Sequence, residues 1–98
     1  MNITFVSSTE RCGIASYTNH LAGALREAGH SVAITPPDLA HIPSGDIVHV
    51  QHEYGLHRAA ARFSAWLSRV TWPLVVTCHT VPIPGHPQSP QIDWLMTV

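Results

Sequence analysis

The fold is decided by the first third of the chain, residues 2–35, which read NITFVSSTERCGIASYTNHLAGALREAGHSVAIT. The largely apolar run Asn2–Val6, rich in β-branched and aromatic residues, predicts a strand. From Gly13 apolar residues recur every three or four positions, which predicts an amphipathic helix that Gly29 ends as a C-cap. Ser31–Thr35 predicts a second strand. The expected buried face of the helix consists of Ile14, Tyr17, Leu21, Leu25 and Ala28.

The rest of the chain continues the alternation of strands and helices. Residues 46–52 predict a third strand, residues 58–70 a second helix, and residues 73–78 a fourth strand. That fourth run is almost continuously apolar, which is typical of a strand buried on both faces of a parallel sheet. The expected buried face of the second helix consists of Ala59, Phe63, Trp66, Leu67 and Val70. This order predicts an α/β layer fold.

The last part of the chain has a different composition. Four prolines between residues 81 and 90 exclude a regular helix there. Residues 92–98 are again apolar and predict a fifth strand or a short terminal segment.

Length and charge exclude several classes of protein. The 98 residues are 45% hydrophobic and 11% charged, with a net charge of −1, which fits one domain spanning residues 1–98. Lysine is absent, and the five arginines are scattered, so a basic patch for nucleic acid is not expected. No apolar run approaches the ~20 residues of a membrane helix. Because residues 1–6 lack the basic flank and cleavage site of a signal peptide, a cytoplasmic location is expected, with Cys12 and Cys78 as thiols.

Ligands of open parallel sheets bind beyond the carboxyl ends of the strands. That rule selects three segments here, namely residues 8–13, 51–55 and 77–80. The first leads into a helix N-terminus, where backbone N–H groups favour an anion such as phosphate. The third contains His79, which could exchange protons or hydrogen bonds near neutral pH. Neither a dinucleotide fingerprint nor an ATP-hydrolysing phosphate loop occurs.

The histidines invite a metal-site interpretation. His49, His52 and His57 lie close to Glu53 in the sequence. However, His49 and His52 are three apart on a predicted strand and therefore face opposite sides. No cysteine has a zinc-knuckle spacing and no H-E-x-x-H occurs, so no metal is expected. The hydroxyls of residues 7–9 lack a nucleophile elbow, and the cysteines lack a C-x-x-C pair.

Four motifs together resemble one known family. They are Arg11-Cys12-Gly13-Ile14-Ala15-Ser16-Tyr17-Thr18, Gly29-His30-Ser31-Val32, Asp46-Ile47-Val48-His49-Val50-Gln51-His52-Glu53-Tyr54-Gly55 and Val75-Val76-Thr77-Cys78-His79-Thr80-Val81. In this order they resemble the N-terminal half of a family 4 glycosyltransferase. The resemblance covers residues 1–81.

The resemblance implies a GT-B architecture, in which two Rossmann-like halves face each other across a cleft. It implies a parallel sheet of four or five strands in the order 2-1-3-4-5. The implied reaction is metal-independent transfer of a hexose from a nucleoside diphosphate sugar to an acceptor hydroxyl, with no cofactor. The implied donor phosphate and sugar loop is Arg11, Cys12 and Gly13; the implied catalytic residue is His79; the implied acceptor side is Gln51, His52, Glu53 and Tyr54.

The resemblance also implies partners. The nucleotide-binding second half, with its paired glutamates and basic residues, is not in these 98 residues, and residues 82–90 stand where family members have a helix. We therefore expect that the chain alone transfers little or no sugar and requires a C-terminal half or self-association. The acceptor would be a carbohydrate or lipid-linked molecule, which allows a peripheral position at a membrane, although no basic amphipathic helix occurs.

Two other classes of function fit the same sequence. One is a non-catalytic module that binds a carbohydrate or a protein. The other is a flavodoxin-like nucleotide-binding regulatory domain, because doubly wound sheets of this size exist alone. Fold class alone does not separate the three.

Overall fold

The computed structural model describes residues 1–8, 13–52 and 60–79. Over these residues the order of elements is β1 (Asn2–Val6), α1 (Gly13–Glu27), β2 (Ser31–Thr35), β3 (Ile47–His52), α2 (Ala60–Arg69) and β4 (Leu74–Cys78). The strands form one parallel sheet in the order β2-β1-β3-β4. This is the arrangement of a Rossmann-like α/β half, and it confirms the first four strands of the predicted order. The predicted fifth strand lies outside the described residues.

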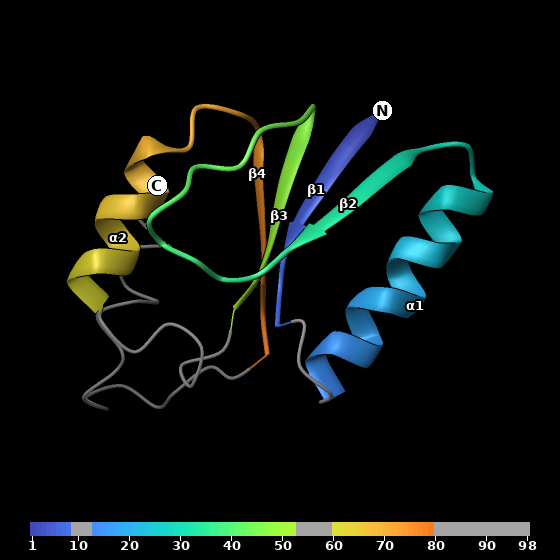
Figure 1. Cartoon of the computed structure of the whole chain (residues 1–98), viewed down its shortest axis with the longest axis horizontal. Helices are drawn as coiled ribbons and strands as arrows, with labels where there is room; N and C mark the ends of the chain where they lie inside the picture. Colours follow the sequence, from blue (N-terminus) through green and yellow to red (C-terminus); the bar gives the residue numbers. More distant parts are fainter. Residues whose placement is uncertain (9–12, 53–59, 80–98) are drawn as a thin grey trace.

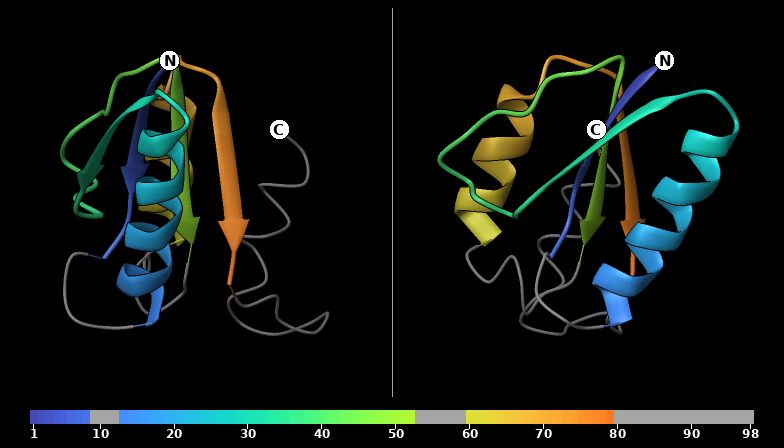
Figure 2. Two further views of the ribbon diagram at one scale, coloured as in Figure 1. Left: turned by 90° about the vertical axis from the view of Figure 1, so that its right-hand side faces the viewer. Right: turned by 45° about the vertical axis from the view of Figure 1, so that its right-hand side comes forward.

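The two helices lie on opposite faces of the sheet (Figures 1 and 2). We call the face that contacts α1 the α1 face and the other the α2 face. On the α1 face, Ala22 packs with Ile3 and Phe5 of β1 and with apolar residues of β2. On the α2 face, three side chains of α2 form the larger core with β1, β3 and β4. They are Phe63, Trp66 and Leu67, as predicted.

The buried stripe of α1 differs from the predicted one. Small residues face the sheet, namely Ala15, Thr18 and Ala22, while Leu21 and Leu25 flank them and are partly buried. Tyr17 is 48% exposed, and Ala28 is exposed too. The prediction was therefore wrong for these two residues. Small side chains let the helix axis come closer to the sheet, and this leaves Tyr17 at the side of the helix.

Strand β4 is also less buried than predicted. Leu74 and Val76 pack on the α2 face, but Val75 on the α1 face is 44% exposed. The reason is that α1 packs over β1 and β2 and does not extend over β4. Burial on both faces was therefore the wrong interpretation of this apolar run.

Helix α1 ends in a Schellman motif. The N–H of Gly29 donates to the carbonyl of Arg26 (3.0 Å), and the N–H of His30 donates to that of Leu25 (3.1 Å). Gly29 has a φ of 96°. This conformation is unfavourable for residues with a Cβ, so the predicted C-cap is confirmed.

Gly29→Ala is expected to lower the free energy of unfolding by about 1 kcal/mol, because the left-handed conformation strains alanine. The space around the position is open, so no clash adds to this cost. Urea unfolding measures the change, with Gly29→Asn as the control, since asparagine tolerates this conformation better. Equal stability of Gly29→Ala and the wild type would contradict the described cap.

Candidate functional site

A groove lies where the first turn of α1 meets the carboxyl end of β4. It has a volume of about 550 Å³ and is lined by Gly13, Ile14, Tyr17, Thr77 and His79. The lining residues come from two segments more than fifty residues apart in the sequence, and the parallel sheet brings them to one edge. This is the edge at which ligands of open α/β sheets bind.

Polar side chains of β3, of β4 and of the residue after β4 form two diagonal hydrogen bonds beside this groove. His49 Nε2 lies 2.7 Å from Thr77 Oγ1, and His79 Nε2 lies 2.7 Å from Gln51 Oε1. In the strand register Gln51 is opposite Thr77, so each bond joins residues two positions out of register. All four side chains lie on the α1 face of the sheet. We call them the polar ladder.

The ring of Tyr17 connects α1 to the polar ladder. It meets the His79 ring edge to face, with centroids 5.4 Å apart. Beyond the end of β4, the backbone N–H of His79 donates to the carbonyl of His52 (3.1 Å). These two contacts fix both the ring and the main chain of His79, so the imidazole reaches the groove in a defined position.

The other histidine of the ladder, His49, is half-buried on the α1 face. Its ring lies 4.8 Å from that of Phe5, centroid to centroid. Burial lowers the pKa of His49 below its usual 6.5, and the charge that His79 acquires on protonation lowers it further. Neutral imidazole is therefore the stable form of His49 in the folded chain.

This lowered pKa predicts that acid destabilises the fold. As the pH falls through about 6.5, the unfolded chain binds a proton at His49 that the folded chain does not, so stability falls until the folded pKa is passed. We expect the urea midpoint to drop between about pH 7.5 and about pH 5.5, and to drop less in His49→Gln. Identical pH dependence in the two proteins would contradict the assignment to His49.

The hydroxyl groups at the end of β1 have a structural role. Ser7 is fully buried, and its Oγ lies 2.8 Å from Thr18 Oγ1 on α1. The backbone N–H of Ser7 donates to the carbonyl of Thr35 (2.9 Å). These bonds hold the start of α1 against the sheet, and they occupy a hydroxyl that would otherwise be a candidate nucleophile.

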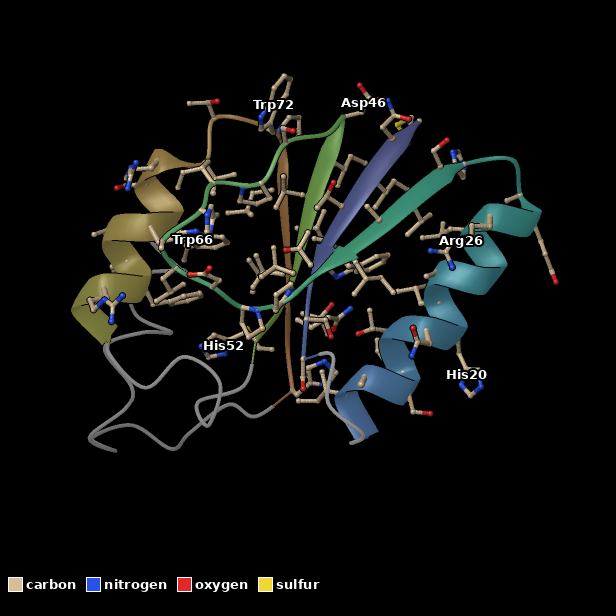
Figure 3. The ribbon with its side chains drawn as sticks, in the orientation of Figure 1. His20, Arg26, Asp46, His52, Trp66 and Trp72 are labelled. Atoms are coloured by element: carbon tan, nitrogen blue, oxygen red, sulfur yellow. The ribbon has the colours of Figure 1, made fainter. Side chains whose placement is uncertain are left out.

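The structure separates the residues that the sequence selected as a site. Gly13 and His79 line the groove, and Gln51 lies directly behind His79. His52 lies on the opposite, α2 face, where it is fully buried with its ring 5.0 Å from that of Phe63 (Figure 3). The strand alternation predicted for His49 and His52 is thus confirmed. Arg11, Cys12, Glu53 and Tyr54 lie outside the described residues.

Two lining residues, Ile14 and Tyr17, are not among the site residues that the sequence predicts, because their spacing predicts the buried face of α1. Thr77 lies in the predicted segment 77–80, although the sequence gives it no role of its own. A signal existed for Thr77, because it is the polar residue two positions before His79 and shares its strand face.

A second cavity, of about 360 Å³, lies at the carboxyl end of β2 on the α2 face. It is lined by Val6, Thr35, Pro36, Asp38, His41, Ile42, Pro43 and Trp66. Its polar groups are already paired. The indole N–H of Trp66 donates to the carbonyl of His41 (2.6 Å), and Asp38 accepts from the backbone N–H of Ala40. The hydrogen bond from Ala40 lowers the pKa of the Asp38 carboxyl most, and the hydrogen bond with the His41 side chain lowers it further. These contacts anchor the loop between β2 and β3.

Two further observations concern metal ligands and thiols in the part of the chain described here. Within residues 1–8, 13–52 and 60–79, no three His, Cys, Asp or Glu side chains are grouped to hold a metal ion. Burial raises the pKa of the Cys78 thiol. This favours the protonated form, which is a poor nucleophile.

Comparison with known proteins adds no relative to this picture. No protein family, curated protein or solved structure matches the chain. Neither helix in the described residues has the length and apolar character needed to cross a membrane.

Proposed function

We propose that the chain is the N-terminal, acceptor-side half of a glycosyltransferase that resembles family 4. It would act in transfer of a hexose from a nucleoside diphosphate sugar to an acceptor hydroxyl. The parallel sheet in the order β2-β1-β3-β4 supports the architecture. The meeting of His79 with the first turn of α1 in one groove is the observation that carries the proposal.

The first turn of α1 suits the diphosphate. It contains no acidic residue, and the backbone N–H groups of a first helical turn carry the positive end of the helix dipole. A Cβ on Gly13 has no atom of the described residues within 4 Å, which leaves room beside the main chain there. As the sugar is transferred, negative charge develops on the leaving diphosphate, and the helix end would stabilise it without a metal ion.

The β4 side of the groove suits a sugar. His79 and Thr77 offer hydrogen-bonding groups, while Ile14 and the exposed ring of Tyr17 offer apolar surface for the C–H groups of a hexose. Pockets that combine a few directed polar groups with apolar walls are typical of small-molecule sites. His79 would hold a hydroxyl of the transferred hexose, and the acceptor would approach from the end of β3.

The proposal includes a partner half. The groove lies at the edge of the area that α1 covers, on the same face as the exposed Val75. Transfer to an acceptor rather than to water requires a site closed to solvent. A second nucleotide-binding half, or a second copy of the chain, would close the groove and supply the remaining contacts to the nucleotide.

Titration calorimetry tests the proposal with UDP-glucose and GDP-mannose, with the corresponding nucleoside diphosphates, and with the free hexoses. We expect the nucleotide-sugars to bind most tightly, with millimolar affinity for the isolated chain. His79→Ala should weaken nucleotide-sugar binding about tenfold, the loss of one well-placed hydrogen bond, and should leave binding of the diphosphates unchanged.

Other outcomes favour the other two classes. Equal affinity for a free hexose and its nucleotide-sugar would indicate a carbohydrate-binding module. Binding of flavin mononucleotide, with its visible absorbance, in place of the nucleotide-sugars would indicate a flavodoxin-like regulatory domain. Either result would overturn the proposal.

A further inference from the structure

Gln51 is a fully buried polar residue on the groove side of the sheet. Its Oε1 lies 2.7 Å from Nε2 of His79, the residue that directly follows the neighbouring strand β4. The backbone of Gln51 is part of the pairing between β3 and β4. The main chain of Gln51 is therefore fixed, and its side-chain amide presents Oε1 to the imidazole that lines the groove.

The chemistry of the amide determines the protonation of this imidazole. A carbonyl oxygen accepts hydrogen bonds and cannot donate them, so Nε2 of His79 must carry the hydrogen. In neutral imidazole the other nitrogen then has a free lone pair. Nδ1 is consequently the ring nitrogen that this bond leaves for a ligand, and it is an acceptor.

We propose that Gln51 is a positioning residue that holds His79 in the Nε2–H tautomer, so that Nδ1 accepts a hydrogen bond from a hydroxyl of the bound sugar. The inference rests on the proposed function, because it takes the ligand of the groove to be a sugar. It specifies the chemistry of the contact as a neutral hydroxyl donor. A phosphate or carboxylate oxygen would face the lone pair of Nδ1 and be repelled.

The second amide atom argues against a purely structural role. Gln51 Nε2 is buried and has no hydrogen-bond partner within the described parts of the chain. Burying an amide N–H without a partner destabilises a fold. An apolar side chain of similar volume would fill this position without that penalty. The bond to His79 is what a glutamine provides here and a methionine would not.

The tautomer is directly measurable. The reverse orientation of the amide would place its NH₂ group against Nε2 of His79 and would require the Nδ1–H tautomer. Long-range ¹H–¹⁵N correlation spectra of the labelled chain, recorded above the pKa of histidine, distinguish the two. We expect Nε2–H alone in the wild type, and a mixture of both tautomers in Gln51→Met.

Two further variants separate positioning from stability. Gln51→Glu places a carboxylate against Nε2, which favours the doubly protonated imidazolium and so removes the Nδ1 lone pair as an acceptor. Thr77→Val is the matched control, because it breaks only the neighbouring bond to His49 and should leave the tautomer of His79 unchanged. A wild-type Nδ1–H tautomer, or an unchanged tautomer in Gln51→Met, would overturn the proposal.

Ligand affinity completes the test. Gln51→Met and Gln51→Glu should each bind the nucleotide-sugar about tenfold more weakly than the wild type, with binding of the nucleoside diphosphate unchanged. Wild-type affinity in both variants would overturn the positioning role even with the expected tautomer. Absence of nucleotide-sugar binding by the wild type, with the expected tautomer, would instead overturn the proposed function and with it the role of Nδ1.

Discussion

Replacing Phe63 by alanine is expected to lower the free energy of unfolding by about 3–5 kcal/mol. Phe63 is fully buried at the centre of the α2-face core, with its ring 6.2 Å from that of Trp66 and 5.0 Å from that of His52, centroid to centroid. Alanine leaves a cavity beneath α2 that neighbouring strands cannot fill. Since small domains are stable by about 5–15 kcal/mol, this one change removes a large part of the total.

Guanidinium unfolding followed by circular dichroism measures this loss. Phe63→Leu should cost much less, because most of the apolar volume remains. Arg62→Ala, at the exposed neighbouring position on α2, should change stability by no more than about 0.5 kcal/mol. A loss below about 1 kcal/mol for Phe63→Ala would mean that α2 does not pack on the sheet as described.

The second large effect is expected at Gly13 and concerns binding rather than stability. Among the described residues no atom lies within 4 Å of a Cβ at this position, and φ of Gly13 is not positive, so the fold should tolerate alanine. A diphosphate held by the first turn of α1 would approach the main chain where the new methyl group stands. We expect Gly13→Ala to weaken nucleotide-sugar binding at least tenfold, which is about 1.4 kcal/mol.

Gly23 offers a matched control in the same helix. It also has open space around its Cβ position and no positive φ, but it lies ten residues, or about 15 Å, along the helix from Gly13. Gly23→Ala should raise stability by about 0.5–1 kcal/mol and leave binding unchanged. Loss of binding in both variants, or in neither, would show that the ligand does not approach the main chain at Gly13.

Much of the fold could be predicted because local pattern and tertiary structure agree. β1 and β2 have the predicted bounds, Asn2–Val6 and Ser31–Thr35, since short β-branched runs bounded by turn residues have few other options. α1 begins at Gly13 as predicted and ends at Glu27, one residue before the predicted limit at Ala28. The difference lies within the ordinary uncertainty of a helix end.

Burial was harder to predict because it depends on how far each helix extends over the sheet. Periodicity placed Tyr17 among the core residues, yet the smaller side chain of Thr18, one position further along α1, is buried against the sheet instead. The apolar run of β4 gave no sign that Val75 would lie beyond the area covered by α1. Periodicity shows that a helix has an apolar face, but the size of the facing side chains decides which residues occupy it.

The candidate site was only partly predictable for a related reason. Parallel topology brings strand ends together, so Gly13 and His79 could be expected at one edge. The polar ladder needs the register of β3 against β4, which places His49 diagonal to Thr77 and Gln51 diagonal to His79. Register comes from pairing in three dimensions, and neither strand reveals it alone.

The most direct test of the proposed site locates the ligand on the folded chain. Backbone ¹H–¹⁵N correlation spectra would be recorded during titration with a nucleotide-sugar, for the wild type and for His79→Ala. We predict the largest shift changes at Gly13, Ile14, Thr77 and His79, and their loss in His79→Ala at the β4 side of the groove. Saturating titration without shift changes, or with changes confined to the cavity at the end of β2, would contradict the assignment of a sugar site to this groove.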